Sequence, residues 1–565
     1  MYHKAKQLSF ILIFLGGGFL WSNNSCTWDR YAKEQKSQAQ PILPDYSYAG
    51  YQYGTQAIPK VEWKTFDVTQ FGALPNDDQS DFEGIQKTIA AAEKHGSGVV
   101  FFPPGRFLVG ERDDRHVGIN IHGPNIVLRG SGSGLGGTEL HQRNSYHPTD
   151  LTRIWTVPAI FNFKSLHPLG NVHLARNRKS ATVLALVTAD APRESFTIEV
   201  DQPQSFAVGQ TIMICMQNLK ANDSFLKGLQ VRDIFTEIHK NGVSVSEKHT
   251  IAAINGSQIS LQEPLHTPIF AEWNWTIYDY PVVEGWGVED ISFSGNCPAP
   301  FVHHKNYTHD GGFVGVNMAQ CKNSWIRRCR FSNMSGGFSA SGAMASSFIL
   351  NTIDGQQGHG SFGVNWGYGS LIGLSQDLTD KGTFHGPSTS HEQVGAVIWR
   401  YESMGKTKSS ARCGGPDFHA QFPYCTLWDH CTANLSNNGG NYSLQPNHLR
   451  DLTYWNFQQV GTARHLDFWD MPVTDSQRKQ KYFGAGPWVV FPNVIGFHGV
   501  MSTFNQDHIG IFESYGQPVE PSSLYEAQLS LRLGKVPSWI IEAQKEWEQL
   551  KIAHRHAGIS LPQPN

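Results

Sequence analysis

Residues 66–109 read FDVTQFGALPNDDQSDFEGIQKTIAAAEKHGSGVVFFPPGRFLV, and they combine a strand, a capped helix, a glycine turn and a second apolar strand. Polar residues 76–81 supply helix-capping side chains in front of the helix. The next apolar positions have the spacing of a helix with one buried face, and they are Phe82, Ile85, Ile89 and Ala92. The strand at 99–102 is stopped by Pro-Pro-Gly at 103–105. Ordered structure is therefore expected to begin with strand, helix and strand.

This order of elements resembles the N-terminal signature of the pectate-lyase-like β-helix superfamily, in which DV..FGA..nD..DD...IQ.AI leads to G.V.FPPG.Y.V. The chain departs from that pattern at Gly84 and Lys87, where small or apolar residues are common. The resemblance implies a right-handed parallel β-helix whose open end is covered by the helix. Such a cover is physically required, because an open coil exposes unpaired backbone groups.

Short apolar runs that end at Gly, Asn or Ser continue downstream. Between Ile326 and Leu452 they recur every ~23–29 residues, the period of a coil with three short strands and three turns. We therefore predict an all-β protein whose residues 61–515 form one single-stranded right-handed parallel β-helix.

Two stretches break this rhythm. Residues from about 160 to 280 hold alternating strands with longer turns, which predicts a β-rich insertion beside the substrate groove. Residues 516–565 have helical spacing with breaks at Gly534 and Pro537, which predicts a helical cap for the far end. Residues 26–60 are expected to be a linker or an N-terminal wrap.

The N-terminus is typical of an exported protein. Lys4 and Lys6 precede an apolar run at 8–15 that is too short to span a bilayer, so residues 1–25 are predicted to be a secretory signal. Cys26 can accept a lipid, but residues 23–25 match the usual lipobox poorly, so the anchor stays open. We expect the periplasm or the cell surface, and no transmembrane span.

Composition excludes some function classes. The chain has 45 Lys+Arg against 48 Asp+Glu, a net charge of −3, and no basic cluster of the kind that binds nucleic acid. Its 8 cysteines show no CxxC pair or zinc spacing. Cys413 can pair with Cys425 or Cys431, but we favour Cys321, Cys329 and Cys431 as small fillers in strands. We expect a monomer without a cofactor.

Four polar clusters lie about one coil apart, so a regular solenoid would place them on one side as a groove. They span residues 302–312, 355–366, 385–392 and 412–424. The last one is the richest, because an Arg, an Asp, a His and a Tyr lie between two rigid turns.

These clusters suit chemistry on uronic acids, whose C5 proton is acidic because it lies next to a carboxylate. Its removal needs a cation, a base and a proton donor for the leaving oxygen. We predict His359, Arg412, His419 and Tyr424 as catalytic residues. The predicted substrate-binding residues are His303, His304, Lys305, His385, His391 and Asp417.

Two alternatives to β-elimination remain. A glycoside hydrolase needs a pair of carboxylates, for which Asp354, Asp310 and Asp417 are the candidates; a non-catalytic glycan-binding β-helix needs none. We predict no essential metal. The nearest acidic cluster, Asp77 and Asp78 with Asp81, is more simply interpreted as turn and cap residues.

Residues 411–429 and 522–529 resemble a set of marine and gut Bacteroidetes β-helix proteins from polysaccharide degradation. Their nearest functional counterpart is the oligosaccharide dehydratase of ulvan breakdown. That enzyme removes water from a terminal uronic acid and leaves a 4,5-unsaturated residue. The resemblance implies a carbon–oxygen lyase, and it assigns no catalytic residue in this chain.

Overall fold

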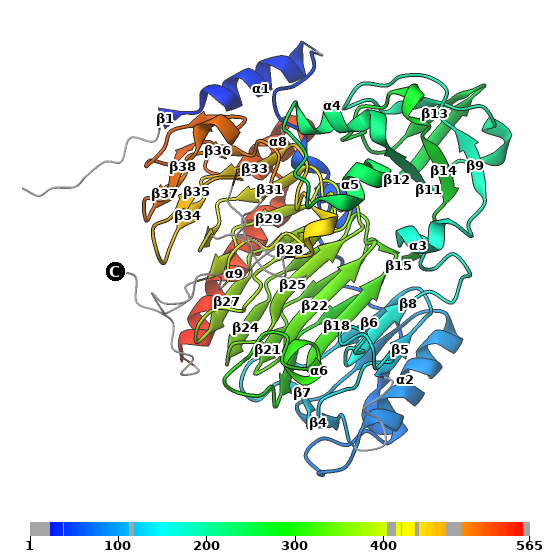
Figure 1. Ribbon diagram of the computed structural model, residues 1–565. Helices are drawn as coiled ribbons and strands as arrows, with labels where there is room; N and C mark the ends of the chain where they lie inside the picture. Colours follow the sequence, from blue (N-terminus) through cyan, green and yellow to red (C-terminus); the bar gives the residue numbers. More distant parts are fainter. Residues whose placement is uncertain are drawn as a thin grey trace, which may run out of the picture.

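The computed structural model describes residues 23–37, 39–111, 118–403, 414–419, 421–435, 440–470 and 488–556. Within them the chain winds into three long sheets of parallel strands (Figure 1), and each full coil adds one short strand to each sheet. This is the right-handed parallel β-helix that the sequence predicts.

The three sheets have 12, 10 and 6 strands. The first contains, in spatial order, β2 (Thr65–Asp67), β3 (Gly98–Phe101), β6 (Ile126–Arg129), β16 (Gly287–Glu289), β20 (Trp325–Arg327), β23 (Ser347–Ile349), β26 (Leu371–Gly373), β29 (Val397–Trp399), β31 (Thr426–Asp429), β33 (Leu452–Trp455), β36 (Asn493–Ile495) and β39 (Phe512–Glu513). The second contains β37 (His498–Gly499), β34 (Gln458–Gln459), β32 (Thr432–Ala433), β30 (Glu402–Ser403), β27 (Gln376–Thr379), β24 (Thr352–Gly355), β21 (Arg330–Ser332), β17 (Ile291–Gly295), β7 (Thr138–Gln142) and β4 (Gly105–Val109). The third contains β28 (Ser388–Ser390), β25 (Gly360–Asn365), β22 (Gly336–Ser341), β18 (Val314–Ala319), β8 (Phe161–Lys164) and β5 (Ile119–Ile121).

The repeat of the coils is visible in one turn. Between the first and second sheets, successive coils place a residue with positive φ at Arg328, Leu350, Leu374, Arg400, His430 and Asn456. These positions lie 22, 24, 26, 30 and 26 residues apart, which is close to the predicted period. Inside the solenoid, residues from adjacent coils stack: the rings of Phe293 and Phe331 are 5.1 Å apart and nearly parallel.

Helix α2 (Phe82–His95) covers the first coils, as the signature implies. Its buried face includes Ile85, Ile89 and Ala92. Gly84 lies so close to the backbone of Ala73 that a Cβ would come within 2.4 Å of the Ala73 nitrogen. Lys87 lies on the outer face, where it pairs with Glu83 at 3.2 Å. Both departures from the family pattern therefore have a local physical reason.

The insertion is an antiparallel sheet that lies between β8 and β16 in the chain. Its strands follow the order β10 (Thr197–Glu199), β13 (Gln258–Leu261), β12 (Val243–Asn255), β11 (Thr211–Asn218), β14 (Thr276–Asp279) and β9 (Val183–Leu186). Short helices α3 (Ala175–Arg178), α4 (Asn222–Leu226) and α5 (Thr236–Asn241) accompany it. It begins later than predicted, because β8 pairs with β5 and β18 of the solenoid.

The chain ends cover the solenoid from outside. Strand β1 (Asn23–Asn24) pairs with β40 (Val519–Glu520), and α1 (Cys26–Lys36) lies at the end formed by the last coils (Figure 1). Residues 39–60 then run back along the coils, with Leu43 and Tyr46 fully buried. Helices α8 (Leu524–Leu533) and α9 (Ser538–His556) flank the break at Gly534. They lie along the side of the solenoid: Trp539 packs on Trp399, and Glu546 pairs with Arg328.

Small isolated strand pairs complete the described structure: β15 (Val283–Glu284) with β19 (Cys321–Lys322), and β35 (His465–Leu466) with β38 (Thr503–Phe504). Cys321, Cys329 and Cys431 are buried free thiols, and Cys425 is also free, whereas Cys413 lies outside the described residues. Among the helices described, none is long and apolar enough to cross a membrane.

Candidate functional site

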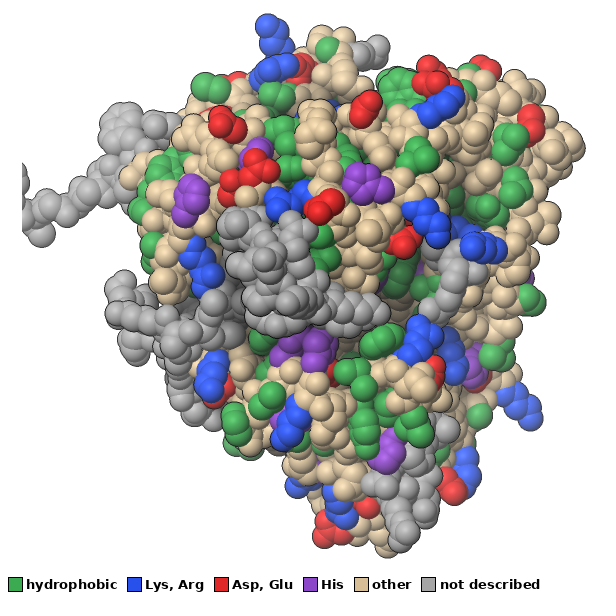
Figure 2. All heavy atoms as spheres, viewed as in Figure 1, with side chains coloured by type: hydrophobic (Ala, Val, Ile, Leu, Met, Phe, Trp, Pro, Cys, Tyr) green, Lys and Arg blue, Asp and Glu red, His purple; other side chains and the backbone are tan. Residues whose placement is uncertain are grey.

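Side chains from successive coils form one group that we call the histidine cluster: His303, His304, His359, His385 and His419, with Asp310 and Asp417. The loop between β17 and β18, which includes α6 (Tyr307–Asp310), supplies His303, His304 and Asp310. His359 directly precedes β25, and the His385 amide donates to its carbonyl from the next coil at 2.8 Å. Asp417 continues the same stack beside Ser388. Histidine side chains gather near the middle of the face shown in Figure 2.

Asp417 binds two imidazoles at once. Its Oδ1 is 3.0 Å from Nδ1 of His385, and its Oδ2 is 2.9 Å from Nδ1 of His419. Burial alone would raise the pKa of this carboxyl, but the adjacent His419 and His385 hold it well below its ordinary value. Asp417 is therefore an anion that fixes both rings through Nδ1, so Nε2 is the second nitrogen of each ring.

Asp310 orients two other members of the cluster. Its Oδ2 lies 2.7 Å from Nδ1 of His304, and its main-chain carbonyl lies 2.8 Å from Nδ1 of His359. A carbonyl can only accept, so Nδ1 of His359 is the donor and the lone pair of the neutral ring is on Nε2. That Nε2 is buried and has no hydrogen-bond partner among the described residues.

Aromatic side chains surround the central imidazoles. The ring of His303 stacks on Phe384 with centroids 4.1 Å apart, and Phe301 stacks on His359 at 5.9 Å. Burial, followed by repulsion from His385 and other cluster histidines, lowers the pKa of His303 to about 2. Burial and His385 likewise lower the pKa of His359 to about 3. Both rings are therefore neutral near pH 7.

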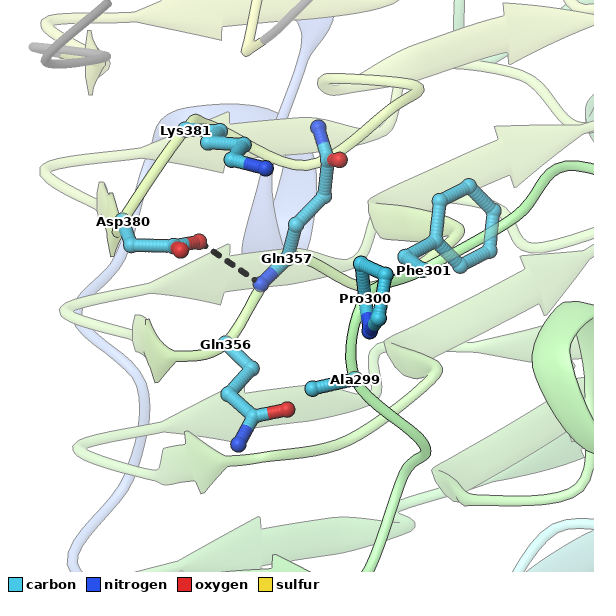
Figure 3. A pocket seen from close by; sticks show the side chains of 7 residues that line it. All are labelled: Ala299, Pro300, Phe301, Gln356, Gln357, Asp380 and Lys381. Atoms are coloured by element: carbon cyan, nitrogen blue, oxygen red, sulfur yellow. Dashed lines mark hydrogen bonds between the residues drawn. The ribbon is translucent and has the colours of Figure 1, made fainter.

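A cavity of about 260 Å³ adjoins the cluster, because Phe301 both lines the cavity and stacks on His359. It is lined by Ala299, Pro300, Phe301, Gln356, Gln357, Asp380 and Lys381. Figure 3 shows Lys381 and Asp380 on one side and the Pro300–Phe301 segment on the other. The main-chain amide of Gln357 donates to Asp380 at 3.0 Å, which ties two adjacent coils together at the cavity wall. The cavity thus offers a cation, amides and an aromatic ring.

The other predicted residues lie elsewhere. Lys305 is exposed on the loop of His303. His391 stacks on Trp366 with centroids 4.1 Å apart, and burial, followed by repulsion from His419, lowers its pKa to about 4. Arg412 lies outside the described residues.

Tyr424 is fully buried beneath the insertion. Its hydroxyl donates to Asp451 at 2.9 Å and accepts from Arg450 at 3.2 Å, and its ring packs edge-on against Phe225. Burial raises its pKa well above the ordinary value. This buried, hydrogen-bonded environment is that of a structural tyrosine.

Sequence reasoning did not assign roles to Phe301, Phe384 or Lys381, which the structure places at the cluster or its cavity, and it considered Asp310 only as a carboxylate for hydrolysis. A signal existed for two of them, because Phe301 lies two residues before His303 and Phe384 directly precedes His385. Asp354, the carboxylate considered for hydrolysis, is instead held by Arg330 at 2.6 Å and by Ser332.

The chain matches two family models. Residues 65–290 match the one described as rhamnogalacturonase A/epimerase, pectate lyase-like, and residues 382–543 match a domain of unknown function (DUF4955). His385, Asp417 and His419 fall within the second match, while the other cluster residues lie between the two. No curated protein sequence matches the chain significantly.

Several solved structures are similar at low identity. The tailspike protein gp49 from Pseudomonas phage LKA1 is 12% identical over 70% of this chain and 64% of that chain, with a TM-score of 0.36. The A-module of mannuronan C-5 epimerase AlgE6 from Azotobacter vinelandii is 12% identical over 81% of this chain and 100% of that chain, with a TM-score of 0.32. This chain thus spans less than two thirds of the LKA1 tailspike.

Together these observations define the scaffold. Residues 65–290 match a pectate lyase-like domain of the rhamnogalacturonase A/epimerase kind, and they contain the first coils of the parallel β-helix and the insertion. Residues 382–543, which contain later coils and the start of the C-terminal helices, match a domain of unknown function.

Proposed function

We propose that this protein is a carbon–oxygen lyase that performs β-elimination on uronic acid residues of an acidic, ulvan-like oligosaccharide or polysaccharide. Dehydration at a non-reducing end is the simplest form. One observation supports it most: the titratable groups of the cluster are mainly imidazoles, and both carboxylates, Asp310 and Asp417, are engaged by histidines. Such a site is equipped with bases, not with the pair of carboxylates that glycoside hydrolysis requires.

His419 is the proposed base. Its side chain is 35% exposed, which makes it more accessible than His385 at 16%. In the reaction His419 takes the proton from C5, the electron pair forms the C4–C5 double bond, and the bond from C4 to its oxygen breaks. The His419 imidazolium then gives a proton to the leaving oxygen, which departs as water or as an alcohol. Asp417 stabilises the imidazolium that forms on His419.

The uronate carboxylate needs a positive charge beside it, because proton loss from C5 places negative charge on that group. Lys381 lines the adjoining cavity, and its positive charge suits an acidic sugar. Phe301 offers an aromatic surface for a sugar ring. Arg412 was predicted for the same role and stays a prediction. The ulvan-type substrate rests on the resemblance of the 411–429 and 522–529 segments.

Hydrolysis is the second candidate reaction. It requires two carboxylates placed on either side of the scissile bond. Asp354 on β24 forms an ion pair with Arg330 on β21, and Asp417 is hydrogen-bonded to two histidines. Neither is in the state of a general acid or a free nucleophile.

Mass spectrometry of products from uronate-containing oligosaccharides tests the proposal. Loss of one water without chain cleavage identifies a dehydratase, and cleavage with an unsaturated end identifies a lyase. Products that gain water would contradict elimination, and bound but unchanged substrate would indicate a binding protein. His419→Ala should abolish the reaction, whereas His465→Ala, an exposed histidine of β35, is the matched control.

A further inference from the structure

Three imidazole nitrogens converge at the centre of the histidine cluster. One ring nitrogen from each of His303, His359 and His385 lies within 4.8 Å of the other two. Nε2 of His303 and Nε2 of His385 are 3.4 Å apart. Two nitrogens bound to one tetrahedral Zn²⁺ at about 2.0–2.1 Å are separated by about 3.4 Å. Two ring nitrogens at the full 4.8 Å would therefore have to move about 1.4 Å closer together to bind one Zn²⁺.

From this geometry we propose that His303, His359 and His385 form a binding site for a divalent transition-metal ion of the zinc type. Neutral imidazoles are suitable ligands for Zn²⁺ and its neighbours, whereas Mg²⁺ and Ca²⁺ prefer oxygen ligands. Three histidines with a fourth position for water or substrate are typical of a reactive metal site. The proposal concerns binding alone and does not depend on the proposed elimination.

The hydrogen bonds of the distal ring nitrogens support this assignment. Nδ1 of His385 is held by the Asp417 carboxylate, and Nδ1 of His359 by the Asp310 carbonyl. Both arrangements place the ring proton on Nδ1 and the lone pair on Nε2. Metal-binding histidines are oriented in this way by a carboxylate or a main-chain carbonyl.

The buried Nε2 of His359 supports the metal site independently of the distances between the rings. This atom has no hydrogen-bond partner among the described residues. A buried acceptor without a partner is unfavourable by about 1–3 kcal/mol, and coordination to an ion would remove that cost. Phe301 and Phe384 pack against His359 and His303, so the site also has the apolar surround that restricts access of water.

Two other residue groups are close enough to hold an ion: His304, Asp310 and His359, and His385, Asp417 and His419. In both groups the carboxylate already accepts a hydrogen bond from a histidine of the same group, at 2.7 Å and at 2.9–3.0 Å. We therefore assign these carboxylates to the orientation of ligands and not to the ion itself.

Metal analysis of untagged protein tests the proposal. After incubation with Zn²⁺ and gel filtration, we expect about one zinc per wild-type chain, and we expect His303→Ala, His359→Ala and His385→Ala each to lose it. His304→Ala should retain zinc as the matched control. Asp417→Asn should weaken zinc binding by about 10–100-fold in calorimetry, because it removes the carboxylate that orients His385. Ca²⁺ should bind far more weakly than Zn²⁺.

X-ray absorption of the wild-type zinc form gives a readout that needs no variant to fold. Three nitrogen ligands at about 2.0–2.1 Å are expected. The proposal is overturned if the wild type retains no stoichiometric zinc, or if His304→Ala removes the ion while His385→Ala keeps it. Neither measurement requires turnover, so a failure of the proposed function would leave both results interpretable.

Discussion

Two groups of histidines and carboxylates in this molecule have opposite proportions. The histidine cluster contains five imidazoles and two carboxylates. Within the insertion, a second group, which we call the insertion cluster, places the imidazole of His249 between Glu247 and Glu263. Nε2 of His249 is 3.1 Å from Glu247, and its Nδ1 is 3.5 Å from Glu263. All three residues are at most 1% exposed.

The ratio of carboxylates to imidazoles decides whether the histidines of each cluster are charged. Burial alone would lower the pKa of His249, but the adjacent carboxylates of Glu247 and Glu263 raise it to about 9. In the histidine cluster, burial and neighbouring imidazoles lower the pKa of His303 and of His359. The insertion cluster is therefore a sealed ion triad that holds β12 against the solenoid near Tyr368. In the histidine cluster, by contrast, the imidazoles of His303 and His359 are neutral. Removing a carboxylate from each cluster should have opposite consequences.

Asp417→Asn is expected to have the largest effect, on activity. It removes the anion that stabilises His419 as an imidazolium, so kcat should fall by about 10²–10⁴-fold. The free energy of unfolding should change much less. Formation of the unsaturated product, followed by its ultraviolet absorbance, measures the rate, and thermal unfolding measures the stability. Equal losses of both would contradict the distinction between the two clusters.

Glu263→Gln should do the reverse. It removes one of the two buried carboxylates that stabilise the His249 imidazolium, so the free energy of unfolding should fall by about 1–3 kcal/mol. The midpoint of denaturant unfolding should fall, while kcat at temperatures well below the transition should stay close to wild type. A lost kcat in a folded Glu263→Gln protein would mean that the insertion also shapes the groove.

Much of the fold was predictable because its decisive signals are local. The strand, helix and strand at 66–109, the period of the coils and the break at Gly534 can all be seen in the sequence. The start of the insertion was not, because only pairing with β5 and β18 assigns β8 to the solenoid. The C-terminal helices were predicted as an end cap, yet periodicity alone cannot specify which surface an apolar face will contact.

The candidate site was predictable as a set of residues but not as a geometry. His303, His359 and His385 lie far apart in the chain, and only the winding of the coils brings their nitrogens within 4.8 Å. No local metal-binding spacing exists for sequence analysis to detect. Tyr424 looked accessible between two rigid turns, but Phe225 of the insertion covers it. The sealed triad around His249 could not be distinguished from an active site without its burial.

Stability should also depend on pH through the insertion cluster. The pKa of His249 is about 9 in the folded protein against an ordinary value of 6.5, so folding favours its protonated form. This contribution, about 3 kcal/mol, is complete below pH 6.5 and is lost as pH rises toward 9. The melting temperature should therefore fall across that range, and His249→Gln should flatten its pH dependence. A wild-type melting temperature that rises across the range would contradict a charged triad.

Lys381→Ala should give the smallest measurable effect. Lys381 is exposed at the cavity beside the histidine cluster, so its charge acts on the substrate through water. Loss of one such charge is worth about 0.5–1 kcal/mol, or about two- to fivefold in kcat/KM. Lys305→Ala is the control, because Lys305 is equally exposed but does not line the cavity. The effect of Lys381→Ala should shrink with added salt, because screening weakens exposed charges first. Equal effects of the two variants would mean that the cavity is not where the acidic sugar binds, and that attraction is spread over the whole surface around the cluster.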